Sequence, residues 1–293
     1  MIEIDAVTLI PLREEVNINA KIFKGRRPTV FHVTHHKAGS QWVAEVLKHA
    51  AGSRFVKPQL NVGHVCDQPI RLGRIYPTVY LPRERLDQYL KPMQTGRDSS
   101  PPSLKTYHRL LRTMLSFQTM RSPVIRFVVI RDLRDTLISL YYSSRYSHPL
   151  LKERVAKRRE LLKGLEKEDA LIYLIQGALK RQAHLQMSWI ESTRDFLLVR
   201  YEDLLANEFD MFRKIIDYCE MPVSSERLYE IVNGNSFENF TGRKRGDEDV
   251  YSHQRKGIAG DWRNHFTDRI KKIFKQKWGE VLIKTGYEQD LNW

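Results

Sequence analysis

The sequence predicts a single α/β domain built on a central parallel sheet that is flanked by helices. Three short apolar segments support this prediction, namely residues 29–34 (TVFHVT), 124–130 (VIRFVVI) and 196–200 (FLLVR). Each is followed by a polar turn and a helical pattern. Strands that alternate with helices favour parallel pairing, and such sheets bind ligands at the carboxyl ends of their strands. The turns after these strands are therefore the first places to look for a functional site.

The chain order places a peripheral arm before the first strand, over residues 1–28, and one domain over residues 29–293. After the first strand, the apolar spacing from Trp42 to Ala50 predicts a helix. The segment that begins at residue 91 is rich in Pro, Ser and Gly. This composition predicts an exposed insertion over residues 91–120.

The second half of the chain is expected to be mostly helical. Apolar spacing predicts helices over about residues 169–191, from Tyr201 to Cys219, and over about residues 268–284. The basic run 152–163 (KERVAKRRELLK) predicts a helix with a solvated face. Residues 241–257 are polar, contain three glycines and lack an apolar period. We expect a mobile loop there, of the kind that closes over a ligand.

Composition limits the partners and the compartment. Lys and Arg number 49 and Asp and Glu 35, which leaves a net charge of +14 and points to anionic partners. The two cysteines, Cys66 and Cys219, exclude a disulfide scaffold and a cysteine-rich zinc module. The sequence lacks an apolar run of the roughly 18 residues that a membrane span needs. It also lacks a signal-peptide pattern at its start, and we expect a cytoplasmic protein.

The turn after the first strand has the chemistry of a phosphate cradle. Lys37, Gly39 and Ser40 lie between a strand and a helix N-terminus, where free N–H groups and the helix dipole favour an anion. The spacing is not that of a Walker A loop, and an ordinary capped turn is the alternative. The nearby His32 and the pair His35–His36 suggest a metal site. Since no carboxylate or cysteine accompanies them, anion contact or packing is favoured.

A second anion site is predicted after the strand 124–130. Arg131 ends this strand, and Ser139 lies two turns into the helix that follows. The planar guanidinium offers two parallel hydrogen bonds to a phosphate. For Arg134 and Asp135, a local, exposed ion pair is the alternative to a role at this site.

With these two sites in one chain, the sequence resembles the sulfotransferases that use 3′-phosphoadenosine 5′-phosphosulfate (PAPS) as donor. The resemblance runs from about residue 29 to 267. The family patterns are K-x-G-[ST]-x-W, R-x-x-x-D-x-x-x-S, Y-E-D, S-F and R-K-G-x-x-G-D-W. The residues that match them, in chain order, are Lys37, Gly39, Ser40, Trp42, Arg131, Asp135, Ser139, Tyr201, Glu202, Asp203, Ser236, Phe237, Arg255, Lys256, Gly257, Gly260, Asp261 and Trp262.

The resemblance implies the fold of P-loop nucleotide kinases, PAPS as cofactor, PAP (adenosine 3′,5′-diphosphate) as its product, and no metal. It implies that Lys37 binds the bridging oxygen and stabilises the leaving charge. The other residues implied in cofactor binding are Ala38, Gly39, Ser40, Gln41 and Trp42 for the 5′ group, with Trp42 also against adenine; Arg131, Ser139, Arg255, Lys256 and Gly257 for the 3′-phosphate; Tyr201; and Ser236 and Phe237 near adenine.

The catalytic base is less clearly marked. Family members with a K-T-H-L-P segment use its histidine, and other branches use a glutamate. Here LKTYHRLL offers His108, which we favour as the base, whereas TVYLPRERL has Tyr80 in the histidine position and Glu84 nearby. Glu84 and His36 are the alternatives.

The acceptor is predicted only by class, as a small molecule, a lipid or a carbohydrate with a hydroxyl or amine. No nucleic-acid partner is expected, because the basic residues are scattered and no nucleic-acid-binding motif is present. No transmembrane segment is expected, and peripheral membrane contact and oligomeric state stay open. The rival functions are a nucleotide or nucleoside kinase-like phosphotransferase, a nucleic-acid-binding protein and a catalytically inactive relative.

Overall fold

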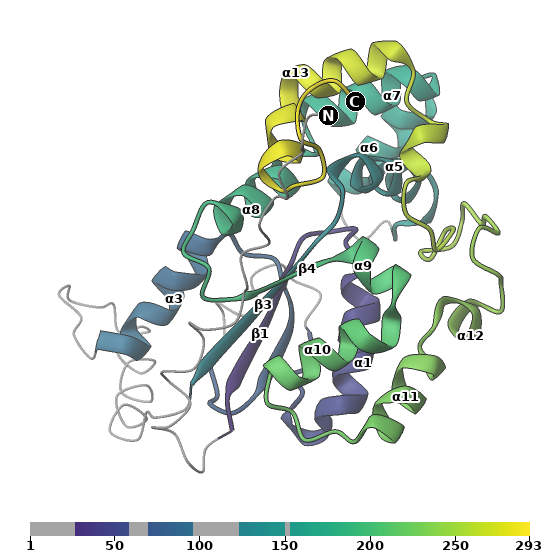
Figure 1. Ribbon diagram of the computed structural model, residues 1–293. Coiled ribbons are helices and arrows are strands. Elements are labelled where there is room, and N and C mark those ends of the chain that lie inside the picture. Colours follow the sequence, from purple (N-terminus) through teal and green to yellow (C-terminus); the bar gives the residue numbers. More distant parts are fainter. Residues whose placement is uncertain (1–26, 59–69, 96–122, 150–152) are drawn as a thin grey trace, which may run out of the picture.

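The computed structural model describes residues 27–58, 70–95, 123–149 and 153–293 (Figure 1). Within them the chain forms a four-stranded parallel sheet of order β2-β1-β3-β4. The strands are β1 (Thr29–Thr34), β2 (Ile75–Val79), β3 (Val124–Ile130) and β4 (Leu197–Arg200). The predicted fold class is therefore confirmed. Most of the predicted arm 1–28 and of the insertion 91–120, including His108, lies outside the described residues.

The edge strand β2 was not predicted from the sequence. Its segment IYPTV contains Pro77, which cannot donate to a sheet ladder and is tolerated at an edge. The pairing of β1 with β2 is irregular between Phe31 and Val33. Thr78 has a positive φ of 55°, and its N–H donates to Nδ1 of His32 at 3.3 Å. Proline and the irregular register together hide this strand from a search for periodic apolar residues.

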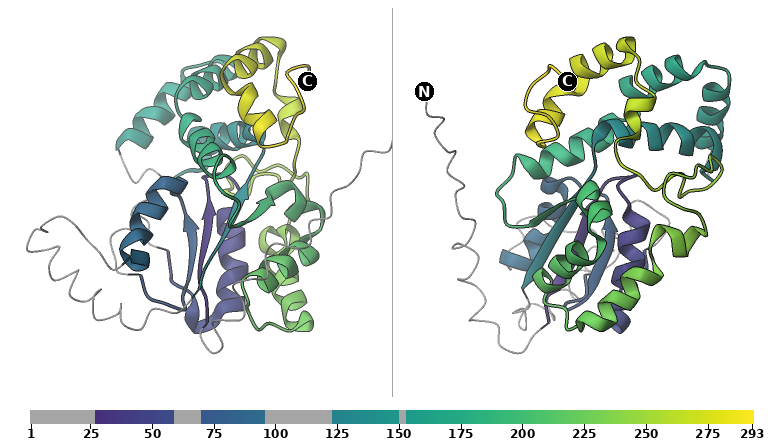
Figure 2. Two further views of the ribbon diagram at one scale, coloured as in Figure 1. Left: turned by 60° about the vertical axis from the view of Figure 1, so that its left-hand side comes forward. Right: turned by 45° about the vertical axis from the view of Figure 1, so that its right-hand side comes forward.

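Helices cover both faces of the sheet, as Figure 2 shows. One face packs against α1 (Ser40–Ala51), α10 (Glu208–Tyr218) and α11 (Ser225–Gly234). The other packs against α3 (Arg83–Thr95) and α8 (Lys180–Ile190). Burial on both faces explains why the central strands β1 and β3 are nearly continuous apolar runs.

A separate helical layer lies beyond the carboxyl end of the sheet (Figure 1). Its core joins α5 (Leu133–Tyr142), α7 (Lys167–Gln176) and α13 (Asp268–Lys284). The remaining elements are η1 (Gly52–Arg54), η2 (Ser143–Ser147), α6 (Glu153–Lys163), α9 (Tyr201–Ala206), α12 (Phe237–Thr241) and η3 (Asp261–Asn264). Helix α6 buries only Leu162, as a solvated basic helix should. No helix in the described part of the chain is long and apolar enough to cross a membrane.

Two predicted helices are each divided in the structure. The prediction of one helix over 169–191 is wrong, because α7 ends at Gln176 and the next residue, Gly177, has φ and ψ of −123° and −70°, which are not helical. Both α7 and α8 pack on α13, and the break lets α8 also reach α3. The helix expected from Tyr201 to Cys219 is divided at Asn207, whose side chain caps α10 by accepting from the N–H of Asp210.

Candidate active site

A cavity of about 560 Å³ lies at the carboxyl ends of the strands. The register explains its position: Thr34 is paired with Val129 and Ile130 with Arg200, so β1, β3 and β4 end side by side. The turns after these strands thus bring Lys37, Arg131 and Tyr201 to one place. The predicted residues that line the cavity are Lys37, Gly39, Ser40, Gln41, Trp42, Arg131, Ser139, Tyr201, Phe237, Arg255, Lys256 and Gly257.

The turn that carries Lys37 is built from unusual backbone conformations. Lys37 and Gly39 have positive φ angles of 75° and 73°. A Cβ on Gly39 would lie 2.6 Å from the Tyr201 ring, so glycine is required there for both its conformation and its size. Helix α1 has no side-chain cap and no acidic residue in its first turn. Its first N–H groups therefore remain available to an anion at the cavity wall.

Lys37 is surrounded by positive charge. Burial, together with the charges of Arg131 and Arg255, lowers the pKa of Lys37 to about 7. An anion in the cavity would relieve this repulsion and raise the lysine's pKa again. The positive charges of Lys37, Arg131 and Arg255 therefore favour the binding of a negatively charged ligand in this cavity.

Arg131 lines the cavity, and one nitrogen of its guanidinium has no hydrogen-bond partner among the described residues. Its Nη1 donates to the carbonyl of Lys37 at 3.1 Å, and its Nη2 donates to the carbonyl of Ile258 at 3.3 Å. The guanidinium carbon lies 4.4 Å from the centre of the Tyr201 ring. The buried Nε has no partner among the described residues. A buried donor of this kind points to a missing acceptor.

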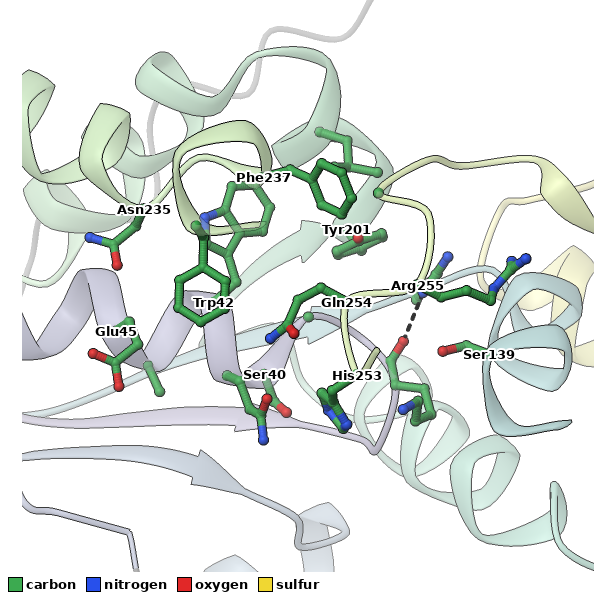
Figure 3. A pocket seen from close by; sticks show the side chains of 18 of the residues that line it. Ser40, Trp42, Glu45, Ser139, Tyr201, Asn235, Phe237, His253, Gln254 and Arg255 are labelled. Atoms are coloured by element: carbon green, nitrogen blue, oxygen red, sulfur yellow. Dashed lines mark hydrogen bonds between the residues drawn. The ribbon is translucent and has the colours of Figure 1, made fainter. Parts of the chain in front are cut away.

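The segment 241–262, called the late loop below, brings Arg255 to the same end of the cavity as Ser139 (Figure 3). Lys256, the next residue of this loop, also lines the cavity. The guanidinium carbon of Arg255 lies 4.4 Å from the centre of the Tyr142 ring, and Tyr142 is one turn beyond Ser139 on α5. Arg255 pairs with Glu248 and Asp261, and Nζ of Lys256 lies 2.8 Å from Oδ1 of Asp261. Although burial opposes it, hydrogen bonds from His265, Lys256 and Arg255 hold the pKa of Asp261 well below its usual range.

Asp135 binds the backbone of the late loop. The ion pair that the sequence suggested between Arg134 and Asp135 is not formed, and this interpretation was wrong. Asp135 accepts from the N–H of Gly260 at 2.6 Å and from that of Trp262 at 2.9 Å. Arg134 is buried, pairs with Asp132 and Glu288, and lies over the rings of Trp262 and Trp293. Adjacent opposite charges in a sequence suggest a local pair, but helix geometry points these two side chains in different directions.

Aromatic side chains form another part of the wall, where Trp42 and Phe237 lie (Figure 3). A Cβ on Gly257 would lie 2.6 Å from the Phe237 ring, so the late loop passes directly over this ring. Two predicted residues are not in the lining. Ser236 caps α12 by accepting from the N–H of Asn239 at 3.3 Å, and the side chain of Ala38 is fully buried.

The segment 241–257 is held by hydrogen bonds to itself. The N–H groups of Gly246 and Asp249 donate to the carbonyls of Lys256 and Arg255, both at 2.9 Å. Arg243 donates to the carbonyls of Asp247 at 2.7 Å and Arg255 at 2.8 Å. The mobility of this loop stays a prediction.

The predicted candidates for the base lie in different places. His108 lies outside the described residues. Glu84 is exposed on α3, 3.8 Å from Nε2 of His184, and does not line the cavity. His36 lines the cavity and stacks on Tyr80, with ring centres 4.1 Å apart.

Sequence reasoning missed several cavity residues, among them Thr78, Tyr80 as a lining residue, and His253. The position of His253, two residues before Arg255 in the R-K-G-x-x-G-D-W segment, is a signal that could have identified it.

The histidines near β1 have partners other than a metal. His32 stacks on Phe127, with ring centres 4.8 Å apart. His35 donates from Nδ1 to the carbonyl of His36 at 2.9 Å and accepts at Nε2 from the N–H of Arg131 at 3.2 Å. This pair of bonds fixes the neutral tautomer, and burial lowers the pKa of His35 to about 4. The described residues contain no cluster of His, Cys, Asp and Glu suited to a metal ion.

The comparisons with known proteins agree on one family. The sulfotransferase domain model matches residues 27–286. Sulfotransferase 1C2 of Homo sapiens is 22% identical over 298 residues, which cover 94% of this chain and 91% of the relative. Cytosolic sulfotransferase 10 of Arabidopsis thaliana is 22% identical over 281 residues, which cover 87% and 79%. The crystal structure of a mouse sulfotransferase complexed with PAP has a TM-score of 0.59 and 19% identity, covering 89% of this chain and 85% of that one. This structural likeness shows a shared fold.

Proposed function

The chain belongs to the sulfotransferase family, whose domain model covers residues 27–286, and we propose that it transfers a sulfuryl group from PAPS to the hydroxyl or amine of a small acceptor. One observation carries the proposal to this particular site. Lys37, Arg131, Ser139 and Arg255 come from separate segments of the chain and converge on one cavity. Such a cavity suits a nucleotide that carries anionic groups at both its 3′ and 5′ positions.

The residues of the cavity fit the donor. The unpartnered Nε of Arg131 offers a hydrogen bond to a phosphate oxygen. Gly39 and Gly257 let the backbone pass close to the aromatic rings of the cavity wall, because a Cβ at either position would lie 2.6 Å from one of these rings. The uncapped start of α1 offers N–H groups to a second anion. Trp42 and Phe237 offer flat surfaces to a base.

We assign the residues to the two ends of the donor as follows. Lys37 and the first N–H groups of α1 hold the 5′-phosphosulfate. Arg131, Ser139, Arg255, Lys256 and Gly257 hold the 3′-phosphate, and Trp42 and Phe237 hold the adenine. Asp261 keeps Arg255 and Lys256 together, because it accepts from both.

The chain's contribution to the reaction is to orient groups and to stabilise charge. PAPS, when bound, would supply the sulfuryl group, and in-line attack of the acceptor on its sulfur would release PAP as the leaving group. Lys37 stabilises negative charge on the bridging oxygen as the bond to sulfur breaks. Because the pKa of Lys37 is about 7 without ligand, part of the lysine is neutral near neutral pH. A bound anion raises this pKa, so that Lys37 is protonated next to the oxygen on which the negative charge develops.

The rival functions have less support. A kinase-like phosphotransferase is not favoured, because the loop after β1 lacks the Walker A spacing and the family model is that of sulfotransferases.

The acceptor we propose is a small hydroxyl compound, which would enter beside His36, Thr78 and Tyr80. The cytoplasmic location predicted from the sequence is supported by the name of the Arabidopsis thaliana relative, a cytosolic sulfotransferase.

Calorimetry with PAP tests the donor assignment directly. We expect Arg131→Ala to weaken PAP binding by about 2–4 kcal/mol, because it leaves the phosphate without a charged partner in a buried site. The variant Arg269→Ala is a matched control, since Arg269 is exposed and pairs with Glu168 and Asp169 far along the chain. An unchanged dissociation constant for Arg131→Ala would refute the assignment.

A further inference from the structure

We propose that His36 is the general base that takes the proton from the acceptor hydroxyl, with Tyr80 as the residue that positions its ring. This inference rests on the proposed function. His36 directly precedes Lys37, and both residues line the cavity. The geometry therefore brings a base and the cation that stabilises the leaving group to one turn.

The imidazole of His36 is fixed in place and chemically free. Its ring stacks on Tyr80, with centres 4.1 Å apart and planes inclined by 29°. The Tyr80 hydroxyl is hydrogen-bonded to Oγ of Ser40 at 2.8 Å, so the stacking surface is itself held by α1. The backbone carbonyl of His36 accepts from Nδ1 of His35 at 2.9 Å. Within the described residues, neither ring nitrogen of His36 has a hydrogen-bond partner, which leaves one of them free for an acceptor proton.

Tyr80 occupies the position in which the resemblance leads one to expect a histidine. Burial raises the pKa of the Tyr80 hydroxyl, which makes it a poor base at neutral pH. Because His36 stacks on Tyr80, its imidazole lies next to the position in which the family would place the histidine.

The carboxylates that line the cavity are committed to other partners. Oε2 of Glu45 lies 2.8 Å from Nζ of Lys48, and Glu208 pairs with Arg245. Of the described residues that line the cavity, His253 is the other histidine. It lies on the late loop and has no aromatic partner that orients its ring among the described residues, in contrast to His36.

The surroundings of His36 keep the imidazole neutral before reaction. Burial, together with the charges of Arg181, Lys37, His148 and Arg154, lowers its pKa to about 4. The phenol of Tyr80 is a further titratable group in contact with the ring. A neutral imidazole can accept a proton, and the negative charge of a bound donor offsets the facing cations when it does.

The proposed step balances as follows. A ring nitrogen of His36 takes the proton of the acceptor hydroxyl while the acceptor oxygen forms a bond to sulfur. The bond from sulfur to the bridging oxygen breaks, and its electron pair stays on that oxygen, next to Lys37. The imidazolium then returns the proton to solvent.

The test compares acceptors that need a base with one that does not. At pH 8, the assays use PAPS with 2-phenylethanol, whose hydroxyl is protonated, and with 4-nitrophenol, which is already ionised. For His36→Asn we expect kcat with 2-phenylethanol to fall at least about 100-fold, the usual contribution of a general base. With 4-nitrophenol we expect a change of less than about 3-fold, since no proton has to be removed. His184→Asn, an exposed histidine paired with Glu84 on the surface, should leave both rates unchanged.

PAP calorimetry on the same variants separates the possible failures. We expect His36→Asn to bind PAP as the wild type does; if it does not fold, His36→Gln takes its place. Equal losses with both acceptors, no loss with either, or an acceptor-dependent loss in His253→Asn instead would overturn the assignment of His36. A wild-type protein that binds PAP but neither transfers to these acceptors nor hydrolyses PAPS would refute the proposed function, and the base with it.

Discussion

Replacing Asp135 with asparagine should weaken PAP binding although Asp135 is not in the cavity. Its carboxylate accepts from the N–H groups of Gly260 at 2.6 Å and Trp262 at 2.9 Å. These bonds hold the turn that contains Asp261, the shared partner of Arg255 and Lys256. An asparagine can accept only one of the two bonds with its oxygen, and its NH₂ group then faces the other N–H.

The magnitude follows from the loss of one hydrogen bond to a charged group. Such a bond contributes about 1.5–3 kcal/mol. If this loss is felt fully at Arg255 and Lys256, the dissociation constant of PAP should rise by about 10- to 150-fold. A turn that redocks after binding would show a smaller rise.

Calorimetry with PAP measures this rise, and thermal unfolding provides the reference. Asp169→Asn is the matched control, because Asp169 is a half-exposed partner of the surface residue Arg269. We expect that control to leave affinity within about 2-fold, as is usual for exposed pairs. If Asp135→Asn bound PAP like the wild type while the fold lost stability, the late loop would not depend on Asp135, and the reasoning would fail.

Three further predictions concern the same cavity. Because the pKa of Lys37 is about 7 in the free protein, Lys37 is mostly neutral at pH 8, and PAP binding should raise its pKa and take up close to one proton there. Affinity should then fall as the pH rises above 7, and calorimetry in HEPES and Tris buffers measures the uptake, which Lys37→Met should abolish. Lys37→Ala should reduce turnover of PAPS by at least about 100-fold without loss of the fold, and wild-type turnover in that variant would contradict its role. Gly39→Ala should destabilise the fold by about 1–2 kcal/mol more than Gly242→Ala does, because both glycines have a positive φ but only a Cβ on Gly39 meets Tyr201. Equal midpoints of urea unfolding for the two variants would show that the contact is unimportant.

Much of the fold could be predicted because the central strands are unambiguous. Segments 29–34 and 124–130 are rich in β-branched and aromatic residues, and the structure forms β1 and β3 over the same residues. The edge strand escaped prediction because Pro77 interrupts it and an irregular register follows. The break at Gly177 was hidden because apolar residues continue on both sides of it, and because α7 and α8 both pack on α13.

The part of the site that is formed by the turns after the strands could be predicted from the sequence. Lys37, Gly39 and Arg131 follow strands directly, so parallel topology alone brings them together. The roles of Asp135 and Arg134 could not be predicted from the sequence, because Asp135 binds the N–H of Trp262 and Arg134 pairs with Glu288, each more than a hundred residues away. The stack of His36 on Tyr80 depends on β2 lying next to β1, which the sequence did not reveal.

A crystal structure of the protein with PAP is the most direct test of the donor site. We expect the 3′-phosphate within hydrogen-bonding distance of Arg131, Ser139 and Arg255, and the 5′-phosphate at Lys37 and the start of α1. Nucleotide bound elsewhere, or bound in this cavity with its phosphates away from Arg131 and Lys37, would contradict the assignment.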